Sequence, residues 1–212
     1  MPPLTETAKE RRAKLPRFAW ENKGYAWWLE TGDNPYDGPE TMVLGVRCLY
    51  QPTATIPMRP LPYNNVKTIV QTDSHVMLLS EWMHWARVIR LDSEHAPPEM
   101  RSLSGDSIGW WEGDTLVVET TNFLDSPGVA REGLRIVERF SAIGGSALLY
   151  EFTVEDPEYL EPYGGELVWP RTGEKSWEYA CHEGNYAMGN MLRGARLYEA
   201  EWQAERDGQS SD

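Results

Sequence analysis

Apolar and polar residues alternate along the middle of the chain, and this period of two is typical of β-strands that bury one face. In residues 134–143, for example, Ile136, Glu138 and Phe140 share one face, whereas Arg139 lies on the other. Strands are predicted over 66–71, 75–81, 86–91, 107–111, 115–121, 134–143 and 147–154, with shorter ones within 42–50 and 176–181.

Glycine-containing turns separate several of these strands. Glu112-Gly113-Asp114 and Gly144-Gly145-Ser146 each lie between two β-rich runs, which is a hairpin signal. Successive strands with short turns form an antiparallel meander, which protects its edges by curling into a barrel or by packing as a sandwich. The pattern predicts a mainly β fold, and we expect a single antiparallel β-barrel.

The two ends of the chain have a helical pattern instead. Helix formers predict a helix over 5–15, and apolar residues at helical spacing predict a closing helix over 185–205. We expect one domain over 1–212, made of an N-terminal helix and wrapping segment (1–64), the barrel meander (65–182) and the C-terminal helix (183–205).

Aromatic residues are unusually distributed in this chain. Its 212 residues include ten Trp and ten Tyr but only four Phe. Residues 22–62 are rich in Gly, Pro and aromatic residues, which predicts an irregular segment wrapped over the core and tethered by Trp20, Trp27 and Trp28. Trp and Tyr combine a large apolar face with a polar group, which favours a partly wet pocket or interface. A barrel core that simply uses Trp is the alternative.

The net charge of −13 narrows the choice of partner. No stripe of Lys and Arg exists to replace the counterions of nucleic acid, and an anionic membrane surface would repel the chain. We therefore expect no nucleic acid and no membrane as partner, and favour a hydrophobic or aromatic small molecule.

The N-terminal residues, the lack of long apolar runs and the two cysteines bear on the cellular compartment in which the protein is expected. Residues 1–16 lack the apolar core of a signal peptide, and no run approaches the ~20 apolar residues of a membrane span. We expect a soluble cytoplasmic protein, or a periplasmic one if a leader has been removed. Cys48 and Cys181 are expected to be two buried free thiols, with pairing as the alternative in an oxidising compartment.

Two neighbouring predicted strands place polar residues on apolar faces. Glu138 lies between Ile136 and Phe140, and Tyr150 lies on the apolar face of the next strand, across the hairpin. Burial without a partner would raise the pKa of a carboxyl group towards the range of a general base. A structural ion pair for Glu138 and simple core packing for Tyr150 are the alternatives.

A second candidate lies where charged and aromatic residues cluster at a predicted strand turn. Histidine can exchange a proton near neutral pH, which makes His84 a candidate base, and Arg87 can bind an oxyanion or a carboxylate. Arg87 shares its strand face with Trp85, which suggests an inward guanidinium. The alternative is structural pairing with Glu81 or Asp106.

Motifs for cofactors and metals are lacking. Cys181-His182-Glu183 has neither the CxxC nor the HExxH spacing of a metal site, Cys181 has no partner that would make it a nucleophile, and His182 and Glu183 fit the start of the closing helix better. No GxGxxG or GxxxxGK[ST] motif occurs. We therefore expect no metal and no cofactor.

Residues 106–123, with the sequence DSIGWWEGDTLVVETTNF, resemble a bacterial family of largely uncharacterised proteins. The family pattern recurs at 137–140, at 150–157 and in YACHEGNY at 179–186, so the resemblance spans roughly residues 47–196. It implies a lipocalin-like or calycin-like β-barrel. The family is common in bacteria that degrade aromatic compounds, and many members look exported, with a leader that this chain lacks.

These observations favour a cofactor-independent lyase or isomerase that acts on an aromatic small molecule, such as a lignin-derived phenol. Glu138 or His84 would be the base, Arg87 would stabilise negative charge, and Tyr150 or Tyr179 would orient or protonate the substrate. The residues expected to line the pocket are Trp85, Tyr179, Tyr63 and Trp111.

Two other classes of function remain open. The same cavity would serve a non-catalytic carrier or sensor of small molecules. Alternatively, the Trp residues would lie at an oligomer interface, such as that of a homodimer.

Overall fold

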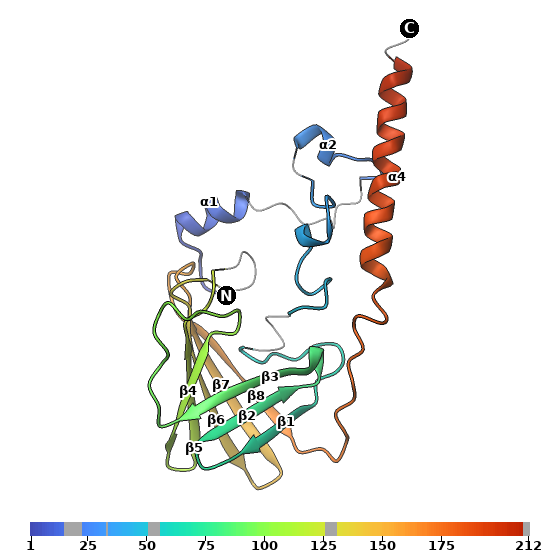
Figure 1. Cartoon of the computed structure of the whole chain (residues 1–212). Helices are drawn as coiled ribbons and strands as arrows, with labels where there is room; N and C mark the ends of the chain where they lie inside the picture. Colours follow the sequence, from blue (N-terminus) through green and yellow to red (C-terminus); the bar gives the residue numbers. More distant parts are fainter. Residues whose placement is uncertain (15–22, 33, 51–55, 126–130, 210–212) are drawn as a thin grey trace. The chain divides into compact units, whose positions relative to one another are not determined.

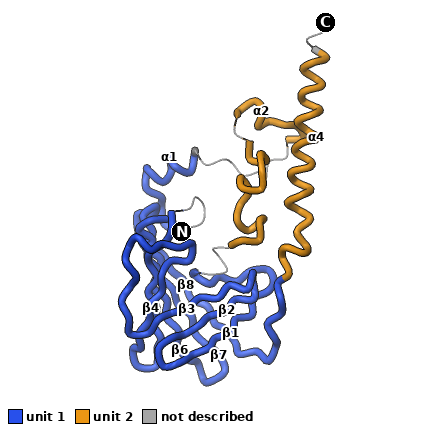
Figure 2. The backbone as a smooth tube through the Cα atoms, viewed as in Figure 1, with its two compact units in different colours: residues 1–13, 51–179 blue, residues 14–50, 180–212 orange. Residues whose placement is uncertain are grey.

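The chain divides into two units in the computed structural model, which describes residues 1–14, 23–32, 34–50, 56–125 and 131–209. Unit 1 combines residues 1–13 with 51–179, and unit 2 combines residues 14–50 with 180–212 (Figure 2).

A curled sheet of eight strands makes up most of unit 1 (Figure 1). Its strands are β1 (Lys67–Gln71), β2 (His75–Ser80), β3 (Trp85–Leu91), β4 (Asp106–Glu112), β5 (Thr115–Thr121), β6 (Arg135–Ile143), β7 (Ala147–Glu155) and β8 (Tyr163–Pro170). Each strand pairs with the next in chain order, and the sheet curls into a half-barrel. The prediction of a mainly β fold is thus confirmed.

One strand pair departs from the predicted antiparallel meander. All neighbours pair antiparallel except β3 and β4, which run parallel through Arg90 with Ile108 and Leu91 with Gly109. The reason is the connection over 92–105, which is long enough to carry the chain back to the end of the sheet where β3 begins.

The prediction missed β8 because glycines interrupt its pattern. Gly164 and Gly165 lie against β7, where a Cβ on Gly165 would stand 3.0 Å from the ring of Phe152. Glycine is therefore required by close packing here, although in the sequence it suggests a turn.

The two short strands expected within 42–50 and 176–181 are wrong. Residues 43–49 form turns, with Leu49 N donating to Leu44 O. In the segment after β8, Trp177 N and Tyr179 N donate to side chains instead of to a strand.

The two predicted glycine hairpins are confirmed. Gly113 lies in the turn between β4 and β5 with a φ of 61°, and Gly144 and Gly145 connect β6 to β7 with φ of 56° and 73°. These left-handed conformations cost glycine little and match the twist of the paired strands.

The core of unit 1 lies inside the curl of the sheet. Its buried members are Met58, Val76, Leu78, Ile89, Leu116, Val118, Phe140 and Tyr150. Burying each large apolar side chain stabilises the fold by about 1.5–3 kcal/mol. Met58 belongs to the segment before β1, so a part of the chain outside the sheet fills its interior.

The N-terminal helix α1 (Glu6–Lys14) confirms the predicted helix over 5–15. Thr5 Oγ1 caps it by accepting from Ala8 N at 3.2 Å. Arg12 joins the helix to the connection between β7 and β8 by donating to the carboxylate of Glu158, at 2.8 Å from Nη2 to Oε2.

Unit 2 contains the helices α2 (Trp28–Thr31) and α4 (Tyr186–Gln209) and the short 3-10 helix η1 (Pro39–Thr41). Helix α4 confirms the predicted closing helix. Trp28 and Ala195 of α4 belong to one buried cluster. Trp27 packs against the same cluster, whereas Trp20 lies outside the described residues. None of the described helices is long and apolar enough to cross a membrane.

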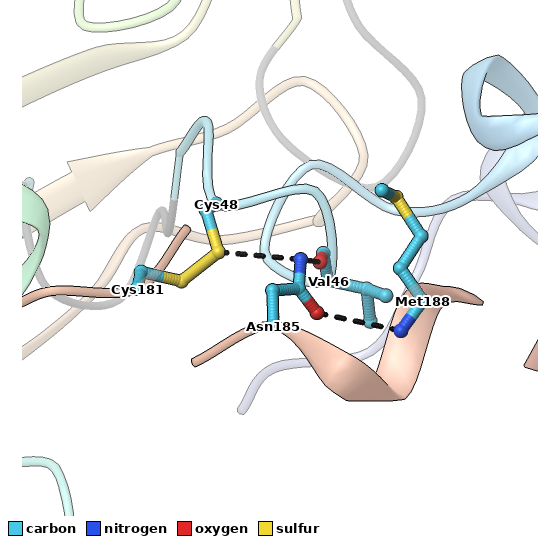
Figure 3. Close-up of a disulfide and its surroundings, with 5 residues drawn as sticks. All are labelled: Val46, Cys48, Cys181, Asn185 and Met188. Carbon is cyan, nitrogen blue, oxygen red and sulfur yellow. Dashed lines mark hydrogen bonds between the residues drawn. A yellow bond between two sulfur atoms is a disulfide. The ribbon is translucent and has the colours of Figure 1, made fainter. Parts of the chain in front are cut away.

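A disulfide between Cys48 and Cys181 lies in unit 2 (Figure 3). The expectation of two free thiols is therefore wrong, because a sequence separation of 133 hides how close the two cysteines lie. Asn185 fixes the same loop by donating from Nδ2 to Val46 O at 2.7 Å (Figure 3). Its Oδ1 accepts from Met188 N and so caps α4.

Candidate functional site

A set of polar side chains is enclosed on the inner face of the sheet. The five consecutive strands from β3 to β7 each contribute one residue, and these are Arg87, Ser107, Thr120, Glu138 and Tyr150. Strand alternation turns each of them inward, and none is more than 5% exposed. We call these five residues the buried polar group.

An ion pair lies at the centre of the buried polar group. Arg87 Nη1 donates to Glu138 Oε1 at 3.1 Å, and Arg87 Nη2 donates to Glu138 Oε2. Two further guanidinium contacts are to hydroxyls, from Nε to Ser107 Oγ at 3.0 Å and from Nη2 to Thr120 Oγ1 at 3.3 Å. The planar fork of arginine suits this bidentate contact, which compensates both charges within the core.

Tyr150 completes the group at the carboxylate of Glu138. Its hydroxyl donates to Glu138 Oε1 at 2.7 Å and accepts from the backbone N–H of Met58 at 2.9 Å. Burial, followed by the negative charge of Glu138, raises the pKa of Tyr150 well above its usual value of 10. The phenol is therefore neutral near pH 7, and its ring stacks on Trp169 with centroids 4.6 Å apart.

Stability alone does not explain an ion pair in this position. Removing two charges from water costs several kcal/mol per ion, and well-packed apolar residues of similar volume are often as stable or more stable. Ionisable groups that are enclosed with specific charge partners are common at functional sites. The buried polar group is therefore the first candidate site.

The predicted inward neighbours Glu138 and Tyr150 thus meet in the structure, together with Arg87. Arg87 pairs with Glu138 rather than with Glu81 or Asp106. The sequence prediction missed Ser107 and Thr120, although both alternate inward on predicted strands and that alternation was a usable signal.

A second row of side chains lies next to the buried polar group on the inner face. Lys67, Ser80 and Trp85 are register partners across β1, β2 and β3. Lys67 Nζ donates to Ser80 Oγ at 2.8 Å, and Ser80 is 1% exposed. Burial lowers the pKa of Lys67 to about 8, although the charge of Glu81 acts in the opposite direction. We call Lys67, Ser80 and Trp85 the lysine row.

Three aromatic rings form a cluster in unit 1. Trp82 belongs to the 3-10 helix η2 (Trp82–His84), and its ring lies 4.6 Å from that of Tyr179 and 4.8 Å from that of Tyr63. Burial, followed by a hydrogen bond with Tyr63, raises the pKa of Tyr179 to about 12. We call Tyr63, Trp82 and Tyr179 the ring cluster.

The remaining predicted site residues lie outside the buried polar group. His84 is exposed, and its Nε2 accepts from Tyr179 N at 2.9 Å, so it belongs with the ring cluster. Trp111 is 42% exposed and shares a cross-strand row with Tyr150, three strands away. Trp85 lies between the two sets, because it is two residues from Arg87 on the same face of β3.

The outer face of the sheet carries a row of charged residues joined by a histidine, which the sequence prediction also missed. His95 bridges two carboxylates, with Nδ1 at 2.8 Å from Asp106 Oδ2 and Nε2 at 3.1 Å from Glu119 Oε1. Arg90 and Arg135 extend the row on either side. We call these five residues the charge ladder. The sequence feature that could have revealed the charge ladder is the presence of opposite charges at outward-facing positions of neighbouring strands.

Two surface depressions lie away from these groups. One of about 360 Å³ is formed on β6–β8 by residues that include Arg139, Glu151 and Glu166, and one of about 380 Å³ lies beside α4 in unit 2. Neither is lined by Arg87 or Glu138. Within the described part of the chain, no three His, Cys, Asp or Glu side chains are grouped to hold a metal ion.

Comparison with protein-family models, with curated proteins and with solved structures finds no match. The function is therefore inferred from the chemistry of the buried polar group and its surroundings.

Proposed function

We propose that unit 1 binds a hydrophobic aromatic small molecule that carries a hydroxyl group, with its ring in the interior of the half-barrel and its hydroxyl on Tyr150. Sheets curled into calycin-like barrels hold a single small ligand inside, and we propose the same placement for this chain.

The observation that carries this proposal is the contact between Tyr150 and Met58. The phenol oxygen of Tyr150 accepts from one backbone N–H, and that donor comes from a segment outside the sheet. A ligand hydroxyl can replace Met58 N–H as donor, while its ring takes the space of the Met58 side chain in the core cluster that also contains Phe140 and Tyr150.

The rest of the buried polar group supports the same role. Arg87 donates two hydrogen bonds to the Glu138 carboxylate, and the carboxylate in turn fixes the Tyr150 hydroxyl. The polar end of the binding site is thereby pre-organised, which reduces the cost of ordering groups when a ligand binds.

A second candidate is the lyase or isomerase reaction on the same molecule. The hydrogen bond of 2.7 Å between Tyr150 and Glu138 favours it, because a proton can pass from a substrate to the phenol as the phenol passes its own to the carboxylate. His84 has no part in this version, since it lies with the ring cluster.

Fluorescence titration with 4-methylphenol and toluene tests the binding. The two differ in the hydroxyl, so 4-methylphenol should quench Trp fluorescence at lower concentration in the wild type. Tyr150→Phe should weaken 4-methylphenol about tenfold, the value of one good hydrogen bond, and leave toluene unchanged. Tyr186→Phe is the matched control, because Tyr186 is 76% exposed. Equal binding of 4-methylphenol to wild type and Tyr150→Phe would refute the proposal.

Mass spectrometry of the same mixtures separates the two candidates. A carrier returns every phenol unchanged, whereas a lyase or isomerase converts at least one of them. In the second case Glu138→Gln should abolish conversion while binding persists, because the amide no longer takes up a proton.

We also propose that the protein works in an oxidising compartment such as the periplasm. The disulfide between Cys48 and Cys181 supports this placement over the cytoplasm, where thiols are kept reduced.

A further inference from the structure

We propose that Lys67 forms an imine with the carbonyl group of an aromatic aldehyde bound at the inner face of the sheet. This inference rests on the proposed function and adds the chemical class of the substrate.

The first support is the position of the amine. Lys67 opens β1 on the inner face, opposite Ser80, and Nζ donates to the Ser80 hydroxyl at 2.8 Å. Among the described residues no carboxylate forms an ion pair with this amine. The uncharged Ser80 hydroxyl thus holds the amine inside the curl of the sheet, and no direct partner compensates the charge of the amine.

The second support is the electrostatic state of the amine. Burial lowers the pKa of Lys67 to about 8, against an ordinary value of 10.5, even though Glu81 raises it. At pH 7.5 about a quarter of such an amine is neutral, compared with about one part in a thousand for an ordinary lysine. Neutral lysine is the form that attacks carbonyl carbon.

The third support is the arrangement of aromatic and polar groups around the lysine row. Trp85 lies in the row itself, and the Leu78–Arg87 pair forms the next row along the strands, about 7 Å away. Arg87 lies one row and two strands away from Lys67 on the same face of the sheet. An aromatic aldehyde with its carbonyl at Lys67 would lie beside Trp85, with a ring hydroxyl on the side of the buried polar group.

The chemical step needs no co-reactant. The neutral Nζ forms a bond to the carbonyl carbon, and the carbonyl oxygen leaves as water with the two amine hydrogens. The product is a C=N bond between Lys67 and the former aldehyde, and no atom is oxidised or reduced.

Reductive trapping of the full chain tests the inference. The protein is treated with 4-hydroxybenzaldehyde and sodium cyanoborohydride at pH 7.5, which reduces each imine to a stable amine, and modified lysines are located by peptide mass spectrometry. The chain has five lysines, at 9, 14, 23, 67 and 175. Lys67 should be modified at least about tenfold faster than Lys175, because its neutral fraction is higher.

Matched controls separate this chemistry from general lysine reactivity. Lys67→Arg should remove the fast modification, whereas Lys175→Arg should leave it unchanged. Propanal, which has no ring, should show a smaller preference for Lys67 than 4-hydroxybenzaldehyde, because only the higher neutral fraction of the amine then favours Lys67. Modification of Lys67 no faster than that of Lys9 and Lys175 would overturn the inference.

The two proposals fail in different ways. Slow modification of Lys67 together with quenching by 4-methylphenol overturns the imine and leaves the binding proposal intact. Fast modification that excess 4-methylphenol slows supports both. Fast modification that 4-methylphenol does not slow would mean that the aldehyde reaches Lys67 without entering the interior where the phenol binds. This outcome overturns the shared site.

Discussion

Glu138 is the residue on which the interior of unit 1 depends. Its two carboxylate oxygens receive the fork of Arg87 and the hydroxyl of Tyr150, and it is fully buried. Removing one partner leaves the other charge uncompensated in a place that water does not reach. The pair is thus costly to break, although an apolar pair of similar volume could replace it.

Glu138→Ala should lower the free energy of unfolding by about 3–5 kcal/mol, because Arg87 then stays buried without its counter-charge. The double variant Arg87→Met with Glu138→Leu should lose far less, since no charge remains. Urea denaturation measures both. Glu166→Ala, on an exposed position of β8, serves as control and should change stability by less than about 0.5 kcal/mol. A double variant as unstable as the single one would contradict this account.

At the scale of elements, the strands of unit 1 are joined on both faces by polar contacts. The charge ladder crosses β3 to β6 on the outside, while the buried polar group crosses β3 to β7 on the inside. His95 also fastens the connection over 92–105 to this outer face. Because β3 and β4 pair over only two register positions, the charge ladder supports the shortest junction of the sheet.

Asp106 should make the sheet sensitive to acid. Burial alone would raise its pKa, but hydrogen bonds from Arg90, His95 and Ala96 outweigh burial and lower the pKa from 3.8 to about 2. On acidification the unfolded carboxyl binds a proton before the folded one does, so its contribution is present above about pH 4 and is lost between pH 4 and 2.

Asp106→Asn should therefore lower stability by on the order of 1 kcal/mol at pH 6, and the difference from wild type should shrink by pH 2. Thermal unfolding of both proteins from pH 6 to pH 2 measures this. A difference that is the same at every pH would show that Asp106 acts only through packing.

Much of this sheet follows from alternation alone, which predicted β1 to β7 and the inward direction of Arg87, Glu138 and Tyr150. β8 was missed because Gly164 and Gly165 are needed for contact with Phe152, a neighbour that only the folded chain provides. The hydrogen bond from Met58 to Tyr150 also escaped prediction, since the two residues are 92 positions apart and Met58 lies outside any strand.

At the scale of the whole molecule, the chain leaves unit 2 at residue 50 and returns to it at residue 180. Cys48 and Cys181 lie beside these two points, so the disulfide closes the loop that contains the whole sheet. A covalent link over 133 residues restricts the unfolded chain strongly. The net charge of −13 works in the opposite direction, through repulsion between like charges.

The native protein should therefore carry no reactive thiol. Iodoacetamide should add no group to protein purified without reductant and two groups after reduction in denaturant. The Cys48→Ser/Cys181→Ser variant should lose about 2–5 kcal/mol of unfolding free energy, the range for a native disulfide. Two alkylated cysteines without reduction would contradict both the disulfide and the oxidising compartment.

In the proposed complex a phenolic ligand takes the place of Met58 N–H on Tyr150. Selective ¹⁵N labelling of the methionines follows this amide directly, and Met188 and Met191 in α4 provide internal controls. Titration with 4-methylphenol should shift the Met58 resonance strongly, leave the α4 resonances in place, and have no such effect in Tyr150→Phe. Binding of 4-methylphenol that leaves the Met58 amide unchanged would contradict the account.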